Sequence, residues 1–410
     1  MNIKTFDLVV IGGGAAGFFG AISAAEHATC PLNILILEKT GQLLNKVKIS
    51  GGGRCNVTHD CLEPKELVKF YPRGHRSLIG PFTHFGPKDT IRWFEEKGVS
   101  LKVEPDGRMF PTTDNSQTII NCLTETAEEL GIEIQTKASV SSVIKKEDEF
   151  LITVKDQGEI QTKALLIATG GTRLAAGAEL AKGLGHNLLP PVPSLFTFTI
   201  DDPLIEDLEG LSVTPAEVSI IDTKYTTKGP LLITHWGVSG PGILKLSALA
   251  SRELSELDYQ FTIKINWCPD AEVARLLKLK RQEWGKKQIS TRSPLAAIPK
   301  RLWSRFCRDL DPELTWSQLT KAQEEVLLNT ITNTTLSVSG KSINKDEFVT
   351  CGGVELKELQ LKRMESKIHP GLYYAGEVIN VDGVTGGFNF QNAWTTGYLA
   401  GKAIAESHSD

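Results

Sequence analysis

Three glycines and a carboxylate near the N-terminus are the first residues whose types and spacing could do chemistry. Gly12, Gly14 and Gly17 form a G-x-G-x-x-G pattern, and Glu38 follows Gly17 by 21 residues. The first glycine permits a tight turn, the second lets a phosphate approach the backbone, and the third lets a helix pack against a strand. Helix N-terminal N–H groups attract phosphate, and a carboxylate at this distance accepts hydrogen bonds from a ribose diol. The spacing therefore predicts a dinucleotide-binding site.

A strand, a helix and a second strand must bring these residues together. The apolar run at residues 8–11 predicts a buried strand before the turn, a helical pattern continues to about residue 25, and a second apolar run at residues 34–38 ends at Glu38. The negative charge of Glu38 disfavours a 2′-phosphate, so NADP is not expected in this first site. FAD and NAD both remain open on this motif alone.

The far end of the chain repeats the arrangement of strand, carboxylate turn, glycines and helix. Residues 373–375 predict a short strand, Gly376 and Glu377 a turn, and Gly386–Gly387 precede a helix that begins near Asn389. The N-terminus of this second helix suits the pyrimidine end of a flavin, which gains negative charge on reduction. This segment favours FAD over NAD.

These motifs support a family resemblance. With "VVIGGGAAG", "SGGGRCN" and "AGEVINVDGVTGGFN" in this order, the chain resembles the BaiN/YhiN-type bacterial flavoproteins, which are aminoacetone-oxidase-like or NAD(P)/FAD-dependent oxidoreductases with a glutathione-reductase-type FAD fold. The matching stretches extend from residue 9 to 401 and are loosest between about 255 and 335. The resemblance implies FAD as cofactor, with NAD(P)H as a transient co-substrate.

The resemblance also implies which residues contact FAD. Residues 45–58 would run from the ribose carboxylate along the cofactor towards its isoalloxazine ring; the alternative is a flexible surface loop. The expected contacts are Gly12, Gly14, Ala15, Ala16, Gly17, Glu38, Lys39, Lys46, Ser50, Gly51, Gly52, Gly53, Arg54, Cys55, Asn56, Val140, Ala168, Thr169, Gly170, Gly376, Glu377, Gly386, Gly387, Phe388 and Asn389.

The sequence identifies no decisive catalytic acid or base. Arg54 can stabilise an anionic flavin or be ordinary solvated charge. Cys55 is expected as a loop thiol near the flavin, and a redox disulfide with Cys61 is the weaker alternative. His235, in "THWGVSGPG", can donate a proton or serve structurally at a strand end.

Several other polar residues carry two interpretations. Lys46 and Lys48 make the 45–58 segment basic and either contact the cofactor or remain solvated. Arg108 either anchors an anionic substrate or lies on a surface turn. Asn389 and Gln391 either face the flavin and substrate or cap the last helix.

The prolines at 190, 191 and 193 predict a domain boundary, because alternating apolar residues follow them. We expect residues 1–193 and 345–410 to form one discontinuous FAD-binding domain of the α/β class. Residues 194–344 would form an inserted substrate or cap lobe, with a β-barrel-like unit at 194–268 and a helical, charged subdomain at 269–335. A substrate cleft between the two parts follows as an expectation.

Composition limits the partners. The net charge of −4 leads us to expect no nucleic acid, although a local basic patch is compatible with it. The seven cysteines lack a C-x-x-C pair, no metal-ligand spacing occurs, and no apolar run approaches the length of a membrane span. We therefore expect a reduced, cytoplasmic protein that acts on a small molecule, without a structural metal or membrane association. The oligomeric state is not predicted.

Three functions follow from these observations. The favoured one is an FAD-dependent reductase that moves a hydride from NAD(P)H to a small unsaturated or carbonyl substrate. The second is an oxidase of a small amine that passes electrons to oxygen. The third is a flavin-holding regulatory protein without turnover.

Overall fold

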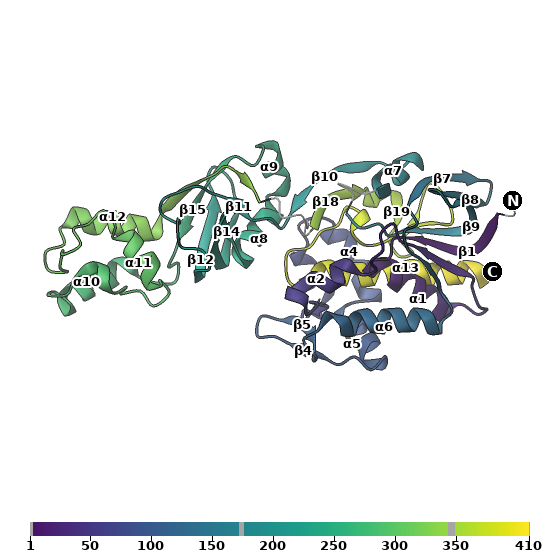
Figure 1. Ribbon diagram of the computed structural model, residues 1–410, viewed down its shortest axis with the longest axis horizontal. Coiled ribbons are helices and arrows are strands. Elements are labelled where there is room, and N and C mark those ends of the chain that lie inside the picture. Colours follow the sequence, from purple (N-terminus) through teal and green to yellow (C-terminus); the bar gives the residue numbers. More distant parts are fainter. Residues whose placement is uncertain (1–2, 172–175, 343–348, 410) are drawn as a thin grey trace. The chain divides into compact units, whose positions relative to one another are not determined.

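The computed structural model describes residues 3–171, 176–342 and 349–409, which form two compact units (Figure 1). Unit 1 comprises Met1–Val192 together with Val349–Asp410, and unit 2 comprises Pro193–Phe348. Both ends of the chain thus build unit 1, and unit 2 is inserted between them. The expected end of the inserted lobe at residue 344 lies outside the described residues.

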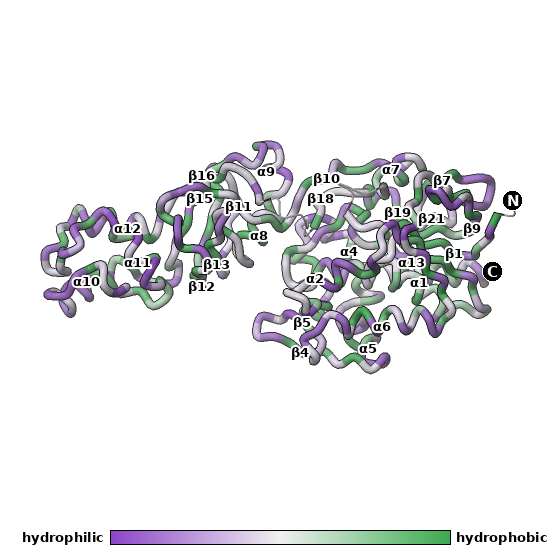
Figure 2. The backbone as a smooth tube through the Cα atoms, viewed as in Figure 1, coloured by the Kyte–Doolittle hydropathy of each residue, from purple (hydrophilic) through white to green (hydrophobic). Residues whose placement is uncertain are grey.

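A parallel sheet forms the centre of unit 1. Its order is β21 (Leu372–Tyr374), β9 (Gly158–Ile167), β1 (Lys4–Ile11), β2 (Ile34–Leu37) and β6 (Glu133–Gln135). Every residue of β2 is buried, as a strand covered on both faces requires. Figure 2 shows the apolar character of β1 and β9. The two apolar runs expected as strands next to the first glycine turn are therefore adjacent strands of this sheet.

Antiparallel strands extend the sheet and flank it. On the side of β9 that faces away from β1, the first half of β9 pairs with β8 and the C-terminal end of β9 pairs with β21. The remaining strands of unit 1 are β3 (Thr58–His59), β4 (Leu101–Val103), β5 (Arg108–Pro111), β7 (Val140–Lys146), β8 (Glu149–Val154), β10 (Leu188–Ser194), β18 (Val349–Val354), β19 (Leu359–Gln360) and β20 (Glu365–Ser366).

Helices α1 (Ala15–His27) and α13 (Phe388–Ser409) pack directly on each other (Figure 1). A Cβ at Gly401 would lie 2.2 Å from the carbonyl oxygen of Gly20, and one at Gly397 would lie 2.7 Å from that of Ala16. Glycine thus allows backbone-to-backbone approach between two helices that begin 373 residues apart. The other helices of unit 1 are α2 (Asn45–Gly53), α3 (Pro64–Leu67), η1 (Val68–Phe70), α4 (His75–His84), α5 (Pro87–Glu96), α6 (Ser116–Glu129), α7 (Ala176–Gly183), η3 (Leu356–Glu358) and η4 (Gly376–Val378).

An antiparallel sheet curls round in unit 2. Its order is β16 (Thr334–Val338), β15 (Phe261–Asn266), β12 (Ser212–Ile220), β13 (Thr226–Thr234), β14 (Gly237–Ser239), β11 (Phe198–Thr199) and β17 (Gly340–Lys341). The two ends of this order, β16 and β17, follow each other in the chain across Ser339. The sheet is therefore barrel-like, as the sequence predicts.

The helical part of unit 2 shares a core with this sheet. It contains α10 (Val273–Glu283), η2 (Ile289–Thr291), α11 (Lys300–Phe306) and α12 (Lys321–Thr332), while α8 (Pro241–Leu249) packs on β13 and α9 (Ser251–Glu256) follows it. Trp267, Trp303 and Trp316 are fully buried in one apolar cluster that extends from Phe196 to Val338. The helical subdomain therefore does not fold around a core of its own.

Candidate functional site

The first glycine turn connects β1 to α1 and requires glycine for two different reasons. Gly12 has a φ of 118°, and a Cβ there would lie 2.3 Å from the carbonyl oxygen of Ala168; a Cβ at Gly17 would lie 2.0 Å from the carbonyl oxygen of Gly12. At Gly14, in contrast, a Cβ would meet no atom within 4 Å. The turn is thus tightly packed on the protein side and open at the start of α1, where Ala15 and Ala16 follow.

Glu38 is held beside this turn. It follows the end of β2, and its Oε2 accepts the N–H of Gly13 at 2.9 Å while its Oε1 accepts the N–H of Thr40 at 2.7 Å. Each carboxylate oxygen keeps acceptor capacity beyond these bonds. Lys39 is exposed next to it. Hydrogen bonds from the backbone thus hold the Glu38 carboxylate beside the first glycine turn.

Two further segments lie against the turn. Ala168, Thr169 and Gly170 follow the end of β9 next to Gly12, and the hydroxyl Oγ1 of Thr169 is buried without a hydrogen-bond partner among the described residues. The segment that leads to Val140 is attached to the Glu38 strand, because the N–H of Ala138 donates to the carbonyl oxygen of Glu38 at 2.9 Å. The residues at 140 and 168–170, which the resemblance places at the cofactor, thus belong to segments that adjoin the first glycine turn or Glu38.

The glycine-rich segment at residues 45–58 begins with a helix, which the sequence does not predict. Residues 45–53 form α2, which kinks where Ser50, Gly51 and Gly52 leave helical geometry. Residues 45–49 contain no glycine or proline and can form a helical turn. The kink forms because Gly51 and Gly52 adopt a positive φ, which glycine does without steric cost. Cβ atoms at Gly52 and Gly53 would meet nothing within 4 Å. Backbone is therefore left bare here, as contact with a ligand would require.

The start of α13 is joined to the end of this segment. A Cβ at Gly387 would lie 2.5 Å from the carbonyl oxygen of Thr58, and with its amide correctly oriented Asn56 accepts the N–H of Gly387 at 2.9 Å. Asn389 uses both its amide atoms on Gly383, at 2.8 Å each. Gly386 has a φ of 135° before Phe388 begins the helix. Asn389 therefore joins Gly383 to the first turn of α13, and its expected contact with the flavin stays a prediction.

The Gly376–Glu377 turn brings the second carboxylate next to α1. A Cβ at Gly376 would lie 2.8 Å from the Cβ of Ala16. Glu377 accepts the N–H of Thr350 at 2.7 Å and pairs with Lys46 at 2.6 Å. Lys46 is thus neutralised by a carboxylate 331 residues away in sequence. The turn, α1 and α2 consequently meet in one place.

The three weak catalytic candidates have different surroundings, each within its own unit. Arg54 pairs with Glu104 at 3.0 Å and Asp114 at 3.3 Å and lies over the Phe110 ring, so its charge is already balanced. Cys55 is buried, which raises the pKa of its thiol to about 12. His235 lies exposed in unit 2, at the turn between β13 and β14.

Two other expectations concern thiols and a turn arginine. Cys55 and Cys61 are both free thiols, so the alternative of a redox disulfide has no support here. The Nε of Arg108 donates to Asp106 at 2.8 Å on the partly exposed strand β5. This local pair matches the interpretation of Arg108 as a surface residue.

Two features of this region escape local sequence patterns. The carboxylate of Asp382 is fully buried and pairs with Arg73, with 2.6 Å between Oδ1 and Nε. The His59 ring stacks on Phe388 with 4.7 Å between centroids, and burial lowers the pKa of His59. An acidic residue inside the apolar, glycine-rich run "VINVDGVTGG" is the signal that would have pointed to Asp382.

Known proteins resemble the chain over its whole length. It is 29% identical to the ribosomal RNA dihydrouridine synthase of Escherichia coli K12, over 99% of this chain and 100% of that protein. It is 26% identical to the 3-dehydro-bile acid delta(4,6)-reductase of Clostridium scindens, over 97% and 98% of the two chains.

Within the described residues no helix is long and apolar enough to cross a membrane.

Solved structures support the fold. The open conformation of a flavocytochrome c3 fumarate reductase matches with a TM-score of 0.52 at 17% identity, covering 99% of this chain and 79% of that one. A 3-ketosteroid-delta4-(5alpha)-dehydrogenase from Rhodococcus jostii RHA1 matches with the same TM-score at 16% identity, covering 98% and 97%. The expected α/β fold of glutathione-reductase-type flavoenzymes is thereby confirmed.

The family model described as the HI0933-like protein Rossmann domain matches residues 6–403. This range includes both glycine turns, both carboxylates and the inserted unit, and it confirms the resemblance that the motifs indicated. The chain belongs to the HI0933-like family of Rossmann-domain proteins.

Proposed function

We propose that this protein is an FAD-dependent reductase that adds hydrogen across a carbon–carbon double bond, with NAD(P)H as donor and a uracil ring of ribosomal RNA as substrate. The observation that carries the cofactor assignment is the turn at Gly12–Gly17. It is closed by backbone contacts at Gly12 and Gly17, open at Gly14, and flanked by the fixed carboxylate of Glu38.

The residues present fit FAD. The N–H groups at the start of α1 would hold the pyrophosphate, and Glu38 would bind the adenosine ribose. The bare backbone of Gly52 and Gly53 and the start of α13 would lie along the flavin half, where a helix N-terminus favours negative charge. Bound there, FAD supplies the hydride acceptor and donor.

The reaction balances without a further reagent. NAD(P)H and one proton enter, the C=C bond becomes a C–C bond with two new C–H bonds, and NAD(P)+ leaves. The chain's own task is to hold the reacting ring in position, to exclude water and to route that one proton. A separate second G-x-G-x-x-G motif is not visible in the sequence, so NAD(P)H and the substrate would visit the same site in turn.

The substrate class is supported by the relatives. A dihydrouridine synthase and a delta(4,6)-reductase are both named for the saturation of a C=C bond, which favours the reductase over the amine oxidase. Of the two substrates, RNA is favoured because relatives from Escherichia coli and Haemophilus influenzae carry the same ribosomal RNA name. A small enone is the second candidate because of the Clostridium scindens relative.

The experiment combines flavin chemistry with product analysis. The purified holoprotein is mixed anaerobically with NADH or NADPH, and the loss of oxidised-flavin absorbance is followed. Ribosomal RNA lacking the modification is then added, and digested nucleosides are analysed by mass for dihydrouridine. Reoxidation of the flavin by RNA with formation of dihydrouridine is expected. Reoxidation by a bile-acid enone but not by RNA would select the second candidate, and rapid peroxide formation with neither substrate turned over would select an oxidase.

A further inference from the structure

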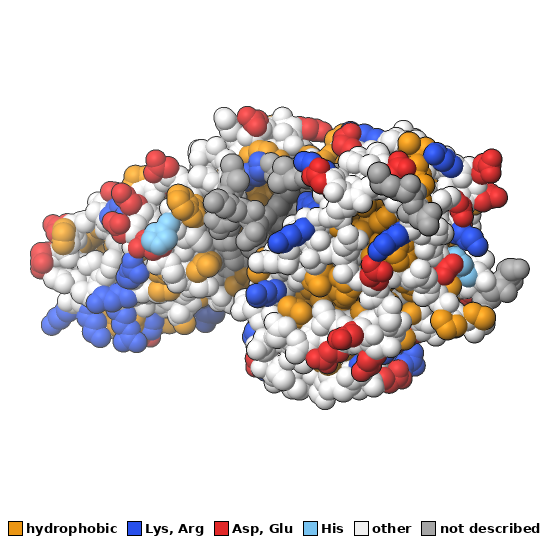
Figure 3. All heavy atoms as spheres, turned by 45° about the vertical axis from the view of Figure 1, so that its right-hand side comes forward, with side chains coloured by type: hydrophobic (Ala, Val, Ile, Leu, Met, Phe, Trp, Pro, Cys, Tyr) orange, Lys and Arg blue, Asp and Glu red, His pale blue; other side chains and the backbone are white. Residues whose placement is uncertain are grey.

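The second unit carries a local excess of positive charge. Residues 273–308 contain eleven lysines and arginines and one glutamate, in a chain whose net charge is −4. Lys and Arg side chains also gather on the surface at the lower left of Figure 3, in the part of unit 2 that contains α10 and α11 in Figure 1. Such a concentration on one segment is an electrostatic feature of its own and not a property of the whole chain.

Helix α11 has a basic, solvent-facing side and an apolar, buried side. Lys300, Arg301, Ser304 and Arg305 lie on one side of α11, and Arg308 follows in the turn after the helix ends at Phe306. All five are exposed or half-buried, and we call them the α11 basic face. The opposite side, with Leu302, Trp303, Phe306 and Cys307, is buried in the core of unit 2. The α11 basic face therefore cannot turn away from solvent without unfolding that core.

Neutral groups hold two of these arginines in place. Arg301 donates to the carbonyl oxygen of Asp207, and Arg305 donates to the carbonyl oxygens of Pro203 and of Glu206, the latter at 2.8 Å. A carbonyl oxygen orients a guanidinium without cancelling its charge. The arrangement preorganises positive charge, which lowers the ordering cost of binding an anion.

The other two cations of the face are weakly paired. The Nε of Arg308 lies 3.7 Å from a carboxylate oxygen of Asp309, whose side chain is 88% exposed, so this pair contributes little. Lys300 is exposed, and the structure gives it no ion pair with any residue it describes. The face thus keeps most of its formal charge.

Helix α10 differs in this respect although it is also basic. Arg275 pairs with Glu272 at 2.9 Å, Arg281 pairs with Glu324 at 3.3 Å, and Lys280 pairs with Glu283. Carboxylates therefore offset three of its four cations. Among the described residues, the only ion pair of the α11 basic face is the weak one between Arg308 and Asp309.

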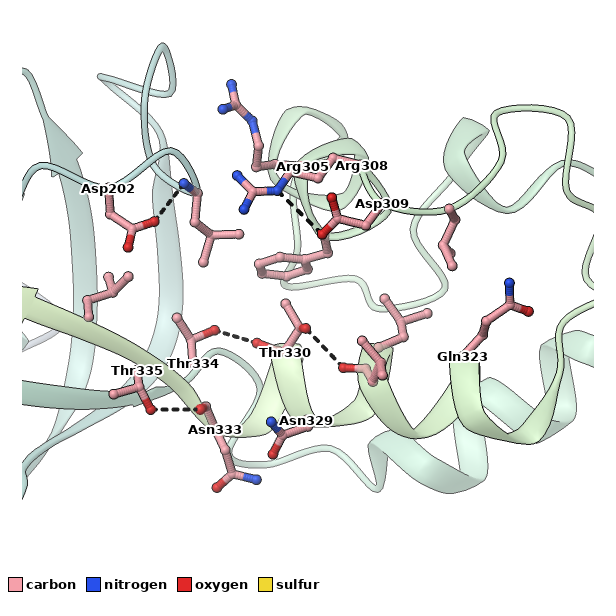
Figure 4. A pocket seen from close by; sticks show the side chains of 16 residues that line it. Asp202, Arg305, Arg308, Asp309, Gln323, Asn329, Thr330, Asn333, Thr334 and Thr335 are labelled. Atoms are coloured by element: carbon pink, nitrogen blue, oxygen red, sulfur yellow. Dashed lines mark hydrogen bonds and ion pairs between the residues drawn. The ribbon is translucent and has the colours of Figure 1, made fainter.

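Two cavities adjoin the face and share Arg305 and Arg308. One, of about 370 Å³, extends from α11 to α12 and is lined there by Asn329, Thr330 and Asn333; Figure 4 shows these side chains opposite Arg308 and Asp309. The other is a shallow surface hollow of about 520 Å³, lined by Lys300 and Arg301 and also by Asp207. Amides and hydroxyls next to guanidinium groups are donors and acceptors suited to sugars and base edges beside phosphates.

We infer that the α11 basic face binds the phosphate backbone of RNA. The inference rests on the proposed function and adds to it the surface that would hold the RNA. A membrane fits less well, because helices that bind membrane surfaces place an apolar side in the lipid, and the apolar side of α11 is already buried. Cations beside polar cavities favour a hydrophilic polyanion.

Salt-dependent binding of the holoprotein to labelled poly(U) and to a ribosomal RNA fragment tests this. In the variant K300A/R308A two phosphate contacts are lost, so the slope of log K against log[salt] should fall by about 1.4 for single strands. The affinity at low salt should fall roughly tenfold or more. The variant K224A/K245A removes the same charge from two exposed positions elsewhere in unit 2 and should bind as the wild type does. Equal affinity and slope for K300A/R308A and the wild type would overturn the inference, as would a preference of the wild type for phosphatidylserine vesicles over both RNAs.

Folding and the proposed function are checked separately. Melting temperature, bound FAD and the rate of flavin reduction by NAD(P)H should match the wild type in K300A/R308A, and K300E alone provides a second variant at a position without an ion pair to described residues. If the wild type binds RNA through this face and forms no dihydrouridine, the proposed function is wrong and the inferred RNA-binding surface is retained. If the wild type modifies ribosomal RNA and K300A/R308A does so equally well at limiting RNA, the surface fails and the function stands.

Discussion

The hydroxyl of Thr58 donates a 2.6 Å hydrogen bond to Oε1 of Gln391, and both residues are buried. The bond joins the end of the glycine-rich segment to the first turn of α13 across 333 residues of sequence. Thr90 donates to the same oxygen at 3.1 Å, and Nε2 of Gln391 donates to Thr395 at 3.0 Å. Gln391 is therefore a structural residue that positions the start of α13.

Replacing Gln391 should destabilise unit 1. In Q391L the hydroxyls of Thr58 and Thr90 lose their acceptor, and each unsatisfied buried group costs about 1–3 kcal/mol. T58V should cost less, because Thr90 still donates to Gln391. Thermal and urea unfolding followed by circular dichroism measure both effects, with Q282L at an exposed position of α10 as control. Unchanged unfolding of Q391L would refute the positioning role.

The two glycines Gly14 and Gly17 should separate cofactor binding from folding. A methyl group at Gly17 collides with the carbonyl of Gly12, so G17A should lose about 1–3 kcal/mol of stability as well as FAD. A methyl group at Gly14 meets no protein atom, so G14A should fold normally and lose FAD affinity because it occupies the space of the pyrophosphate. FAD titration and melting of the flavin-free proteins measure the two effects. Full FAD affinity in G14A would contradict the assignment of this turn.

How much of the site could be predicted depends on how local each feature is. Gly12, Gly17 and Glu38 lie in one strand–helix–strand unit, where spacing alone sets the geometry. The ion pair of Lys46 with Glu377 joins residues 331 positions apart, and a local pattern does not specify it. The sequence places Asn389 at the start of the last helix, but the bonds of Asn389 to Gly383 depend on how that turn folds.

The same limit applies to the partners. Net charge averages over the whole chain and leads to an expectation of no nucleic acid, whereas residues 273–308 concentrate positive charge on one surface. The sequence predicts helical structure in this region, but the burial of Trp303 and Phe306 decides which side of α11 is exposed. That information comes from packing against the core of unit 2.

Glu38 should matter for FAD affinity more than for stability. In E38Q one oxygen and the negative charge are lost, while an amide oxygen still accepts one of the two backbone N–H groups. A hydrogen bond to a charged group contributes about 1.5–3 kcal/mol, so the Kd for FAD should rise roughly 10- to 150-fold. Fluorescence titration measures it. E128Q, an exposed change on α6, should leave the Kd unchanged; an unchanged Kd in E38Q would exclude a ribose contact.

The thiol of Cys55 should neither react with alkylating reagents nor take part in turnover in the folded protein. Burial raises the pKa of its thiol to about 12, so the thiolate is scarce at neutral pH and reagents cannot reach it. Iodoacetamide should label the exposed Cys30 before unfolding and Cys55 only after it. C55A should keep FAD and turnover. Rapid labelling of Cys55 in the native state, or loss of turnover in C55A with FAD retained, would restore it as a catalytic candidate.

His186 should make the stability of unit 1 sensitive to mild acid. Its side chain is fully buried, with Nδ1 2.9 Å from Oε2 of Glu358 and Nε2 2.9 Å from Oγ of Ser366. Ser366 also accepts the N–H groups of Ile368 and His369 at 3.0 Å, so its own proton is free to be donated to Nε2. A neutral imidazole with its proton on Nδ1 satisfies every one of these bonds.

Burial lowers the pKa of His186 below its ordinary value of 6.5, against the opposite effect of Glu358. The unfolded chain therefore binds more protons just below pH 6.5, and the stabilisation is complete above 6.5 and is lost as pH falls through the folded pKa. Unfolding free energies from urea titrations between about pH 5 and 7.5 should decline on the acid side. H186Q should reduce this slope, leaving the part due to His59, whose pKa is also lowered, whereas H84Q at an exposed position should not change it. The pKa of Glu358 is lowered from its ordinary value of 4.5, so the titration of Glu358 affects stability only below the pH range of these titrations. If the free energy of unfolding declines as steeply towards acid pH in H186Q as in the wild type, His186 is not the source of the decline.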